Sequence, residues 1–125
     1  MNVIDSSAWL EYFGDGPNAA AFAKAIQDTR RLVVPTISIF EVFKRLTQQK
    51  GDGDALQAIA VMHQGEVVEL SVPLALDAAR INLERDLPMA DSIMLATSRA
   101  FGATLWTQDA DFEGLPDVKY VKRRK

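Results

Sequence analysis

Short apolar runs alternate along the chain with longer segments whose apolar residues recur every three or four positions. Four of the runs are bounded by polar or turn-forming residues, which is typical of buried strands. These runs are residues 2–5 (NVID), 31–35 (RLVVP), 66–70 (EVVEL) and 103–109 (ATLWTQD). A fifth run, residues 118–121 (VKYV), fits an edge strand. The pattern therefore predicts five strands spread over the whole chain.

Helices are predicted in the segments between these strands, because their apolar residues follow the helical period. The predicted helices cover residues 6–13, 19–26, 38–49, 55–64, 72–86 and 89–101. Ser6 or Ser7 fits the N-cap of the first helix, and Gly102 fits the C-terminal end of the last. The glycine-rich stretch 51–54 is expected to be a loop. Strands that alternate with helices predict an α/β sandwich with a mainly parallel sheet.

The composition predicts one compact domain without a membrane-spanning segment. The chain has 125 residues, of which 48% are hydrophobic, and contains no cysteine. The absence of cysteine excludes disulfides, thiolate zinc sites and thiol nucleophiles. Asp5 interrupts the position where a signal peptide would need an apolar run, and no stretch approaches the roughly 18 apolar residues of a membrane span. We therefore expect a cytoplasmic protein.

The charges are unevenly distributed. The net charge is -3, yet five of the 14 basic residues lie in the last seven positions. These five are Lys119, Lys122, Arg123, Arg124 and Lys125. We predict a domain over residues 1–121 and a short basic tail over residues 122–125, which is typical of a solvated terminus. In a protein that binds nucleic acid, such a tail would add attraction for phosphate.

Four acidic residues lie in apolar surroundings. Asp5 closes the first strand, Glu41 lies inside the third helix, and Asp91 lies near the start of the last helix. Asp109 follows the fourth strand. A buried carboxylate costs several kcal/mol unless it is paired or bound to a cation, so each position needs an explanation.

Each of these acids also has a purely structural explanation. Asp5 fits an N-cap, and Glu41 follows Ser38 at the spacing of a capping box. Asp91 suits the positive end of a helix dipole, and Asp109 suits the start of a turn. The four explanations are independent of one another.

One hypothesis covers all four acids. In a parallel sheet, ligands bind beyond the carboxyl ends of the strands, where two of these acids are predicted to lie. An all-oxygen pocket without cysteine or convergent histidine favours Mg²⁺ or Mn²⁺ over zinc. His63 is the only histidine, which excludes a two-histidine ribonuclease, and no phosphate-binding glycine loop is present. Metal-assisted hydrolysis is the chemistry that remains.

Three segments in this order resemble the PIN-domain ribonucleases, and in particular the VapC-type toxins of bacterial toxin–antitoxin pairs. The segments are VIDSSAWLEYF, VPTISIFEVFKRL and PMADSIMLATSRAFGATLWTQDADFEGL. The resemblance extends from Asp5 to about Val121, and the sequence departs from the family pattern at none of the four acids. It implies a single-domain, PIN-like α/β/α sandwich with a mainly parallel sheet.

The resemblance also implies roles for individual residues. Asp5, Glu41, Asp91 and Asp109 match the four acids of the family's metal site. Asp5, Asp91 and Asp109 would be the main ligands of Mg²⁺ or Mn²⁺, and Glu41 would bind the metal directly or through water. Ser7 and Thr107 match polar positions that support the acidic cluster. Asp111 is a secondary candidate, for which a turn or a supporting role behind the ligands fits at least as well.

The implied function is a metal-dependent endoribonuclease that hydrolyses RNA with a metal-activated water. The implied partners are the RNA substrate, a VapB-type antitoxin and a second copy of the chain. Lys44 and Arg45 lie about one helical turn beyond Glu41, where they could contact phosphate or simply form a solvated helix face. Two other functions stay open from the sequence. One is a binding module whose acidic cluster is structural, and the other is a DNA-directed nuclease of the same fold.

Overall fold

The computed structural model describes residues 1–124, so Lys125 of the predicted basic tail lies outside the described residues. The strands are β1 Asn2–Ile4, β2 Leu32–Pro35, β3 Glu66–Val68, β4 Thr104–Thr107 and β5 Val118–Tyr120. The α-helices are α1 Ser6–Phe13, α2 Ala19–Gln27, α3 Thr36–Lys50, α4 Asp52–Met62, α5 Val72–Arg85 and α6 Met89–Ala100. Two short 3-10 helices are η1 Thr29–Arg31 and η2 Ala110–Phe112. Every predicted strand and helix is present.

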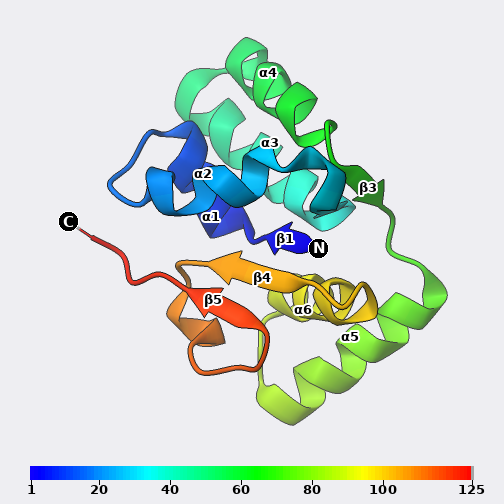
Figure 1. Cartoon of the computed structure of the whole chain (residues 1–125). Coiled ribbons are helices and arrows are strands. Elements are labelled where there is room, and N and C mark those ends of the chain that lie inside the picture. Colours follow the sequence, from blue (N-terminus) through cyan, green and yellow to red (C-terminus); the bar gives the residue numbers. More distant parts are fainter. Residues whose placement is uncertain (125) are drawn as a thin grey trace.

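The strands form one parallel sheet in the order β3-β2-β1-β4-β5 (Figure 1). Val3 of β1 lies in register with Val33 on one side and Leu105 on the other. The chain therefore builds outward from β1 through β2 and β3, and then returns to add β4 and β5 on the opposite side. The order reverses between β1 and β4, which creates a topological switch point at their carboxyl ends.

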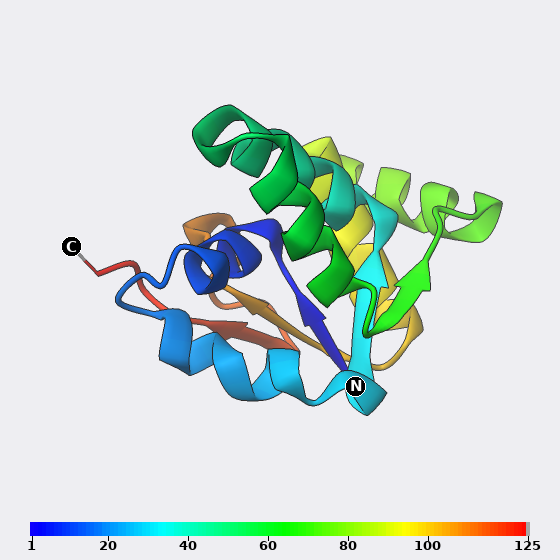
Figure 2. The ribbon, with the colours of Figure 1, turned by 90° about the horizontal axis from the view of Figure 1, so that it is seen from above.

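Helices cover both faces of the sheet, as Figures 1 and 2 show from two directions. The helices α1 to α4 lie on one face, and α5 and α6 lie on the other. Two separate hydrophobic clusters fill the space between these layers and the sheet. Neighbouring residues of β1 divide between them, because Ile4 belongs to the α1–α4 cluster and Val3 to the α5–α6 cluster. The predicted α/β sandwich with a parallel sheet is confirmed.

The N-terminal ends of α1 and α4 differ from the sequence prediction. Neither Ser6 nor Ser7 is the N-cap of α1, because Ser6 is already helical and Asp5 occupies the cap position with extended backbone angles (φ -64°, ψ 154°). Helix α4 begins at Asp52, so the glycine-rich stretch is not a loop. Only Gly51 stays outside the helix, with a φ of 92° that favours glycine.

None of the helices in residues 1–124 is both long enough and apolar enough to cross a membrane.

Gly65 allows β3 to begin close to β2. A Cβ atom at this position would lie 2.8 Å from the backbone oxygen of Leu32, which is closer than real Cβ atoms approach. Because Leu32 is held in the sheet, the backbone of β2 cannot move away without disturbing its pairing. Gly53 in α4 offers a contrast, since a Cβ there meets no atom within 4 Å.

We expect Gly65→Ala to lower the free energy of unfolding by about 1–3 kcal/mol, because the new methyl group forces the β2–β3 edge apart. Gly53→Ala should instead raise it by up to about 1 kcal/mol, because alanine suits a helix better than glycine. Urea unfolding of the two variants and the wild-type chain measures both values. Equal effects of the two substitutions would contradict the close approach at Gly65.

Candidate metal centre

The predicted acids gather at the switch point of the sheet. Asp5 directly follows β1, and Asp109 lies two residues beyond the end of the neighbouring strand β4. The Asp5 backbone N–H donates to the Trp106 carbonyl at 2.9 Å, so strand pairing continues up to the first acid. Crevices at such switch points are the usual ligand sites of open parallel sheets.

Asp5 is a buried carboxylate held by two hydroxyl groups. Its side chain is 3% exposed, and its Oδ2 accepts hydrogen bonds from Ser7 Oγ at 2.7 Å and Thr107 Oγ1 at 2.9 Å. Burial raises the pKa of Asp5 above its ordinary value of 3.8, and the two hydroxyl hydrogen bonds oppose that rise. The negative charges of Asp109 and Glu41 raise this pKa further. The structure therefore places Ser7 and Thr107 directly against the first acid.

The same hydroxyl groups also fix the chain beyond β4. Thr107 Oγ1 accepts a hydrogen bond from the Asp109 backbone N–H at 2.9 Å. Ser7 Oγ accepts one from the Gln108 backbone N–H at 3.2 Å. Each hydroxyl thus donates to Asp5 and accepts from the segment that carries Asp109, so the positions of the two acids are linked.

Asp91, Asp109 and Asp111 form a trio of carboxylates. Each offers one oxygen, and these oxygens lie within 4.8 Å of one another. Asp91 lies in the first turn of α6. Asp109 caps η2, because its Oδ1 accepts from the Asp111 backbone N–H at 3.0 Å. The turn expected for Asp109 is therefore real, and the same turn brings Asp111 beside it.

Asp91 has an unusual charge environment. Partial burial raises its pKa to about 7, and the nearby charges of Asp5, Asp109, Glu41 and Asp111 contribute in that order. At neutral pH the cluster thus resists holding all of its charges at once, a condition that a bound cation relieves.

Glu41 does not form the capping box suggested by its spacing from Ser38. Helix α3 begins at Thr36, so Ser38 is inside the first turn, and its Oγ donates to Met94 Sδ at 3.0 Å. Glu41 Oε1 accepts a hydrogen bond from Ser6 Oγ at 2.6 Å. Its charge raises the pKa of both Asp5 and Asp91, which places Glu41 beside the cluster but outside the carboxylate trio.

Two buried amide side chains behind the site escaped the sequence prediction. Gln108 is 3% exposed and Asn18 is 2% exposed. Asn18 Nδ2 donates to Gln108 Oε1 at 3.1 Å and to the Lys122 carbonyl at 2.9 Å. Gln108 Nε2 in turn donates to the Ser7 carbonyl at 3.4 Å. Neither amide has a sequence signal, because Asn18 lies in a turn-rich stretch and Gln108 beside a more conspicuous acid.

The donor set fits a hard divalent cation. All of the charged groups that converge here are carboxylates, and the trio is the one group of three metal-binding side chains found in residues 1–124. Oxygen donors of this kind suit Mg²⁺ or Mn²⁺. The raised pKa values of Asp5 and Asp91 are the expected state of such a cluster before a cation neutralises it.

Comparison with known families agrees with this arrangement. A model of the PIN domain family matches residues 3–118. The chain belongs to the PIN domain family. The resemblance to this family inferred from the sequence is thus confirmed, and the matched residues span the positions of the four predicted acids. A search of curated proteins finds no match.

Solved structures share the PIN fold of this chain. A toxin–antitoxin complex from Klebsiella pneumoniae has a TM-score of 0.81 at 19% identity, over 95% of this chain and 96% of that chain. VapC20 from Mycobacterium tuberculosis, described as a sarcin–ricin loop cleaving toxin, has a TM-score of 0.77 at 19% identity, over 100% of both chains. VapBC2 from Rickettsia felis, bound to a DNA fragment from its promoter, has a TM-score of 0.75 at 12% identity, over 97% of each chain. At these identities the likeness shows a common fold.

The raised pKa of Asp91 predicts that the metal-free cluster lowers the stability of the folded state by an amount that depends on pH. Between about pH 4 and about pH 7, folded Asp91 keeps a proton that the unfolded chain has already released. The folded state therefore binds more protons, and its stability falls as the pH rises through this window. Asp91→Asn lacks this carboxyl, so its Tm relative to wild type should be higher at about pH 8 than at about pH 5.

Thermal unfolding of both proteins in EDTA measures this difference. Glu84→Gln, which removes an exposed carboxyl group on α5, serves as the control for the loss of one negative charge. A difference between Asp91→Asn and wild type that stays constant with pH would contradict the raised pKa.

Proposed function

We propose that this PIN-domain protein is a VapC-type toxin, a metal-dependent endoribonuclease that a cognate VapB-type antitoxin inhibits. The observation that carries the proposal is the convergence of Asp5, Asp91, Asp109 and Asp111 at the switch point of the sheet. Hydrolysis of a phosphodiester at a carboxylate cluster needs a divalent cation, because the phosphate and the carboxylates would otherwise repel one another.

In this proposal the acidic residues have different roles. Asp91, Asp109 and Asp111 would hold Mg²⁺ or Mn²⁺, which gives Asp111 a larger part than its sequence position alone suggests. Asp5 sets the negative potential of the site from its buried position and is a further candidate ligand. When bound, the cation supplies charge neutralisation at the scissile phosphate and a more acidic water.

Glu41 is suited to orienting water at the edge of the site. Its Oε1 is fixed by Ser6 Oγ, which restricts the side chain and leaves its other oxygen without a hydrogen-bond partner among the described residues. A carboxylate with one restrained and one available oxygen can accept a hydrogen bond from a water and fix its direction. We therefore assign Glu41 to the site through water rather than to the carboxylate trio.

RNA is the substrate that the comparisons favour. VapC20, which shares this fold along its whole length, is described as cleaving the sarcin–ricin loop. The two chains superpose with a TM-score of 0.77 over the full length of both. A DNA-directed nuclease of the same fold would use the same acids, so a direct comparison of substrates belongs in the test.

The purified chain, free of any antitoxin, is expected to cleave structured RNA with Mg²⁺ or Mn²⁺ and to stop in EDTA. Asp91→Asn should slow cleavage by at least about a hundredfold, because it removes several kcal/mol of charge stabilisation. Thr107→Val should also slow it, since Asp5 loses a donor and the Asp109 N–H loses an acceptor.

Thr104→Val is the matched control at the other end of β4, because the Thr104 side chain makes no hydrogen bond with any residue in the range 1–124. Gel assays of RNA and of DNA with all three variants separate the possibilities. Metal-independent cleavage, or full activity of Asp91→Asn, would overturn the proposal. Cleavage of DNA but not of RNA would show that the protein is a DNA-directed nuclease.

The proposed antitoxin would act through the charge of this site. Two of the similar structures are complexes of toxins with antitoxins. Asp111 is exposed and Asp91 and Asp109 are half-buried, so a basic side chain from a partner can reach the carboxylates. Such a side chain would neutralise the cluster in place of a metal, and opposite charges give such an interface its specificity.

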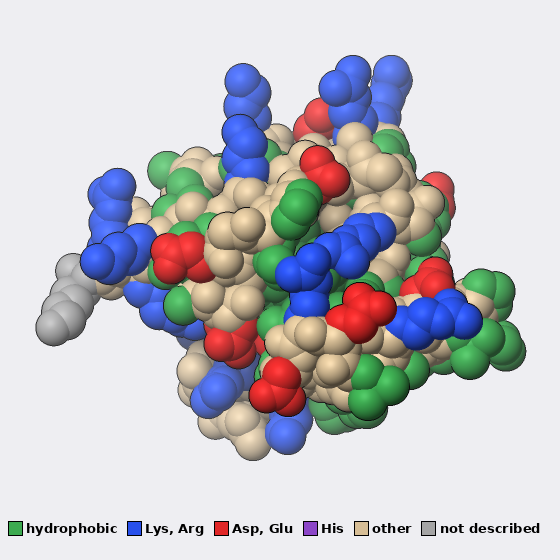
Figure 3. Space-filling view, turned by 90° about the horizontal axis from the view of Figure 1, so that it is seen from below, with side chains coloured by type: hydrophobic (Ala, Val, Ile, Leu, Met, Phe, Trp, Pro, Cys, Tyr) green, Lys and Arg blue, Asp and Glu red, His purple; other side chains and the backbone are tan. Residues whose placement is uncertain are grey.

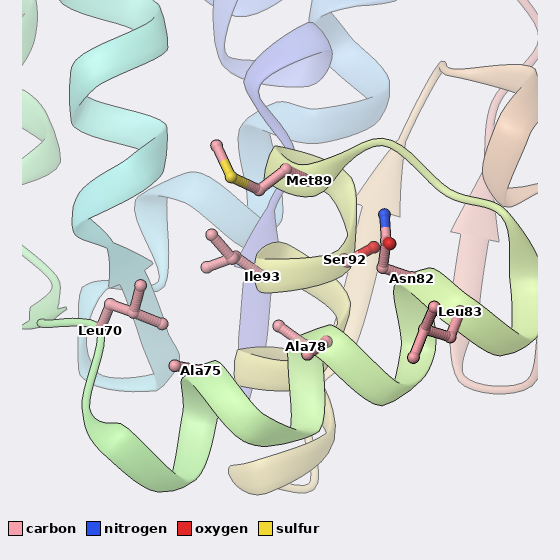
Figure 4. A pocket seen from close by; sticks show the side chains of 9 residues that line it. Leu70, Ala75, Ala78, Asn82, Leu83, Met89, Ser92 and Ile93 are labelled. Carbon is pink, nitrogen blue, oxygen red and sulfur yellow. The ribbon is translucent and has the colours of Figure 1, made fainter.

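A second copy of the chain is the partner we assign to the α5–α6 side. Five large apolar side chains are exposed there, and they are Leu70, Val72, Leu76, Leu83 and Met89. A groove of about 530 Å³ runs between α5 and α6, lined almost entirely by apolar side chains (Figure 4). Figure 3 views the molecule from this side, where apolar side chains lie among basic and acidic ones. A group of exposed apolar side chains beside an apolar groove is a feature of protein interaction sites.

Leu83→Glu should convert a dimer into a monomer, because Leu83 is 83% exposed on α5 and a charge there would have to be buried between two copies. Leu56→Glu, on α4 and 53% exposed, is the matched control and should leave the dimer intact. Light scattering coupled to size-exclusion chromatography gives the mass of each. A monomeric wild-type chain at all concentrations would exclude this assignment.

A further inference from the structure

A cavity between α1 and α3 adjoins the metal centre on the side of Glu41. Its volume is about 310 Å³, and Ser6 and Glu41 form part of its wall. Ser6 directly follows Asp5 in the chain, and the charge of Glu41 reaches both Asp5 and Asp91. A molecule in this cavity would therefore lie next to the carboxylates. The volume is at the lower end of the range for small-molecule sites, which suits one nucleotide rather than a long segment.

Phe40 lines this cavity from helix α3. Its side chain is 60% exposed, and it is the only exposed aromatic residue among residues 1–124. It belongs to neither hydrophobic cluster. Lys44 Nζ lies 5.9 Å from the centroid of the Phe40 ring. The ring is therefore held out toward solvent beside a cation, where a planar group can stack on it.

Two basic side chains complete the wall of the cavity. Lys44 and Arg45 both line it and are exposed. Neither forms a salt bridge within the part of the chain that the structure describes. Their charge is thus available to an anion, only one helical turn from Glu41. Positive side chains next to a carboxylate cluster would attract a phosphate chain toward a site that otherwise repels it.

We propose that this cavity binds one nucleotide of single-stranded RNA beside the cleaved phosphodiester, with the base stacked on Phe40 and the phosphates bound by Lys44 and Arg45. The proposal rests on the proposed ribonuclease function and specifies how its substrate is held. Stacking on an aromatic ring requires an unpaired base, so the cavity selects unpaired RNA. Because every base has a face that can stack, Phe40 would select single-stranded over double-stranded RNA without preferring a particular base sequence.

A basic antitoxin segment fits this cavity less well than RNA does. The antitoxin proposed above brings positive charge to the carboxylates, and Lys44 and Arg45 would repel that charge. RNA brings phosphates and flat bases, which match the basic and aromatic side chains of the wall. A partner chain in the cavity is therefore the competing outcome of the experiment.

The test measures RNA binding in a background that keeps the RNA intact. All variants carry Asp91→Asn, and the probe is a short fluorescein-labelled single-stranded RNA with all four bases, titrated with and without Mg²⁺. Phe40→Ala should weaken binding about five- to a hundredfold, through loss of one stacked base. Phe40→Trp should preserve binding, because the larger ring still stacks. Leu56→Ala, which removes an exposed apolar side chain on α4, should leave binding unchanged.

The double variant Lys44→Ala, Arg45→Ala should weaken binding of all sequences alike. It should also reduce the slope of log affinity against log salt by about 0.7 for each phosphate that the protein no longer neutralises. The control is Arg85→Ala with Arg99→Ala, because these exposed arginines lie in the last turns of α5 and α6. It removes the same net charge and should leave the slope unchanged.

Kinetics of the active chain separate this inference from the proposed function. Phe40→Ala alone should raise KM more than it lowers kcat with a single-stranded RNA substrate. If wild type cleaves RNA but the cavity variants bind and cleave normally, this inference is overturned and the ribonuclease stands. The same holds if those variants lose only an antitoxin, which would assign the cavity to that partner. If RNA is bound through the cavity but never cleaved, the proposed function fails and the cavity remains a binding site. If RNA is neither bound nor cleaved, both fail.

Discussion

The burial of the Asp5 carboxylate between two hydroxyl groups is the constraint on which the carboxyl edge of the sheet depends. Ser7 and Thr107 both donate to the same oxygen of Asp5, and they come from different elements, since Ser7 lies in α1 and Thr107 ends β4. A buried carboxylate is costly, so hydroxyl donors that reach it must be held in place. The sheet provides that rigidity, because β1 is its central strand and pairs on both edges. The position of Asp109 then follows, since its backbone N–H donates to Thr107.

Like charges at this edge make the fold less stable than the same sheet would be with neutral residues. Asp91 illustrates the cost, because its surroundings raise its pKa to about 7. A protein that keeps such a cluster gives up stability to hold groups that attract cations, which is the pattern expected of functional sites. The basic wall formed by Lys44 and Arg45 lies outside the cluster, where it balances the potential without neutralising the carboxylates.

Much of the fold and of the candidate site could be predicted from the sequence, because strands and their terminal acids leave local signals. Asp5 and Asp109 follow apolar runs, and in a parallel sheet that places them at one edge. The capping box predicted at Ser38 is absent, because α3 already begins at Thr36 and the Ser38 hydroxyl group donates to Met94 in α6 instead. The position of Asp111 in the carboxylate trio depends on η2, which brings it beside Asp109. A single 3-10 turn of this kind has no clear signal in the sequence. The hydrogen bond from Ser6 to Glu41 joins residues 35 positions apart, and no pattern of hydrophobic spacing reports such a pair.

Val121 and Lys122, which follow the last strand, lie at the same edge of the sheet as the carboxylates. Val121 donates its backbone N–H to Thr107, and Asn18 then holds the Lys122 carbonyl. Met1 lies at the opposite edge, because its carbonyl accepts from Thr104 at the amino end of β4. The two termini are therefore inequivalent as attachment points. A surface or affinity matrix coupled to the N-terminus would present the carboxylate edge to solution, whereas the same coupling at the C-terminus would turn that edge toward the support.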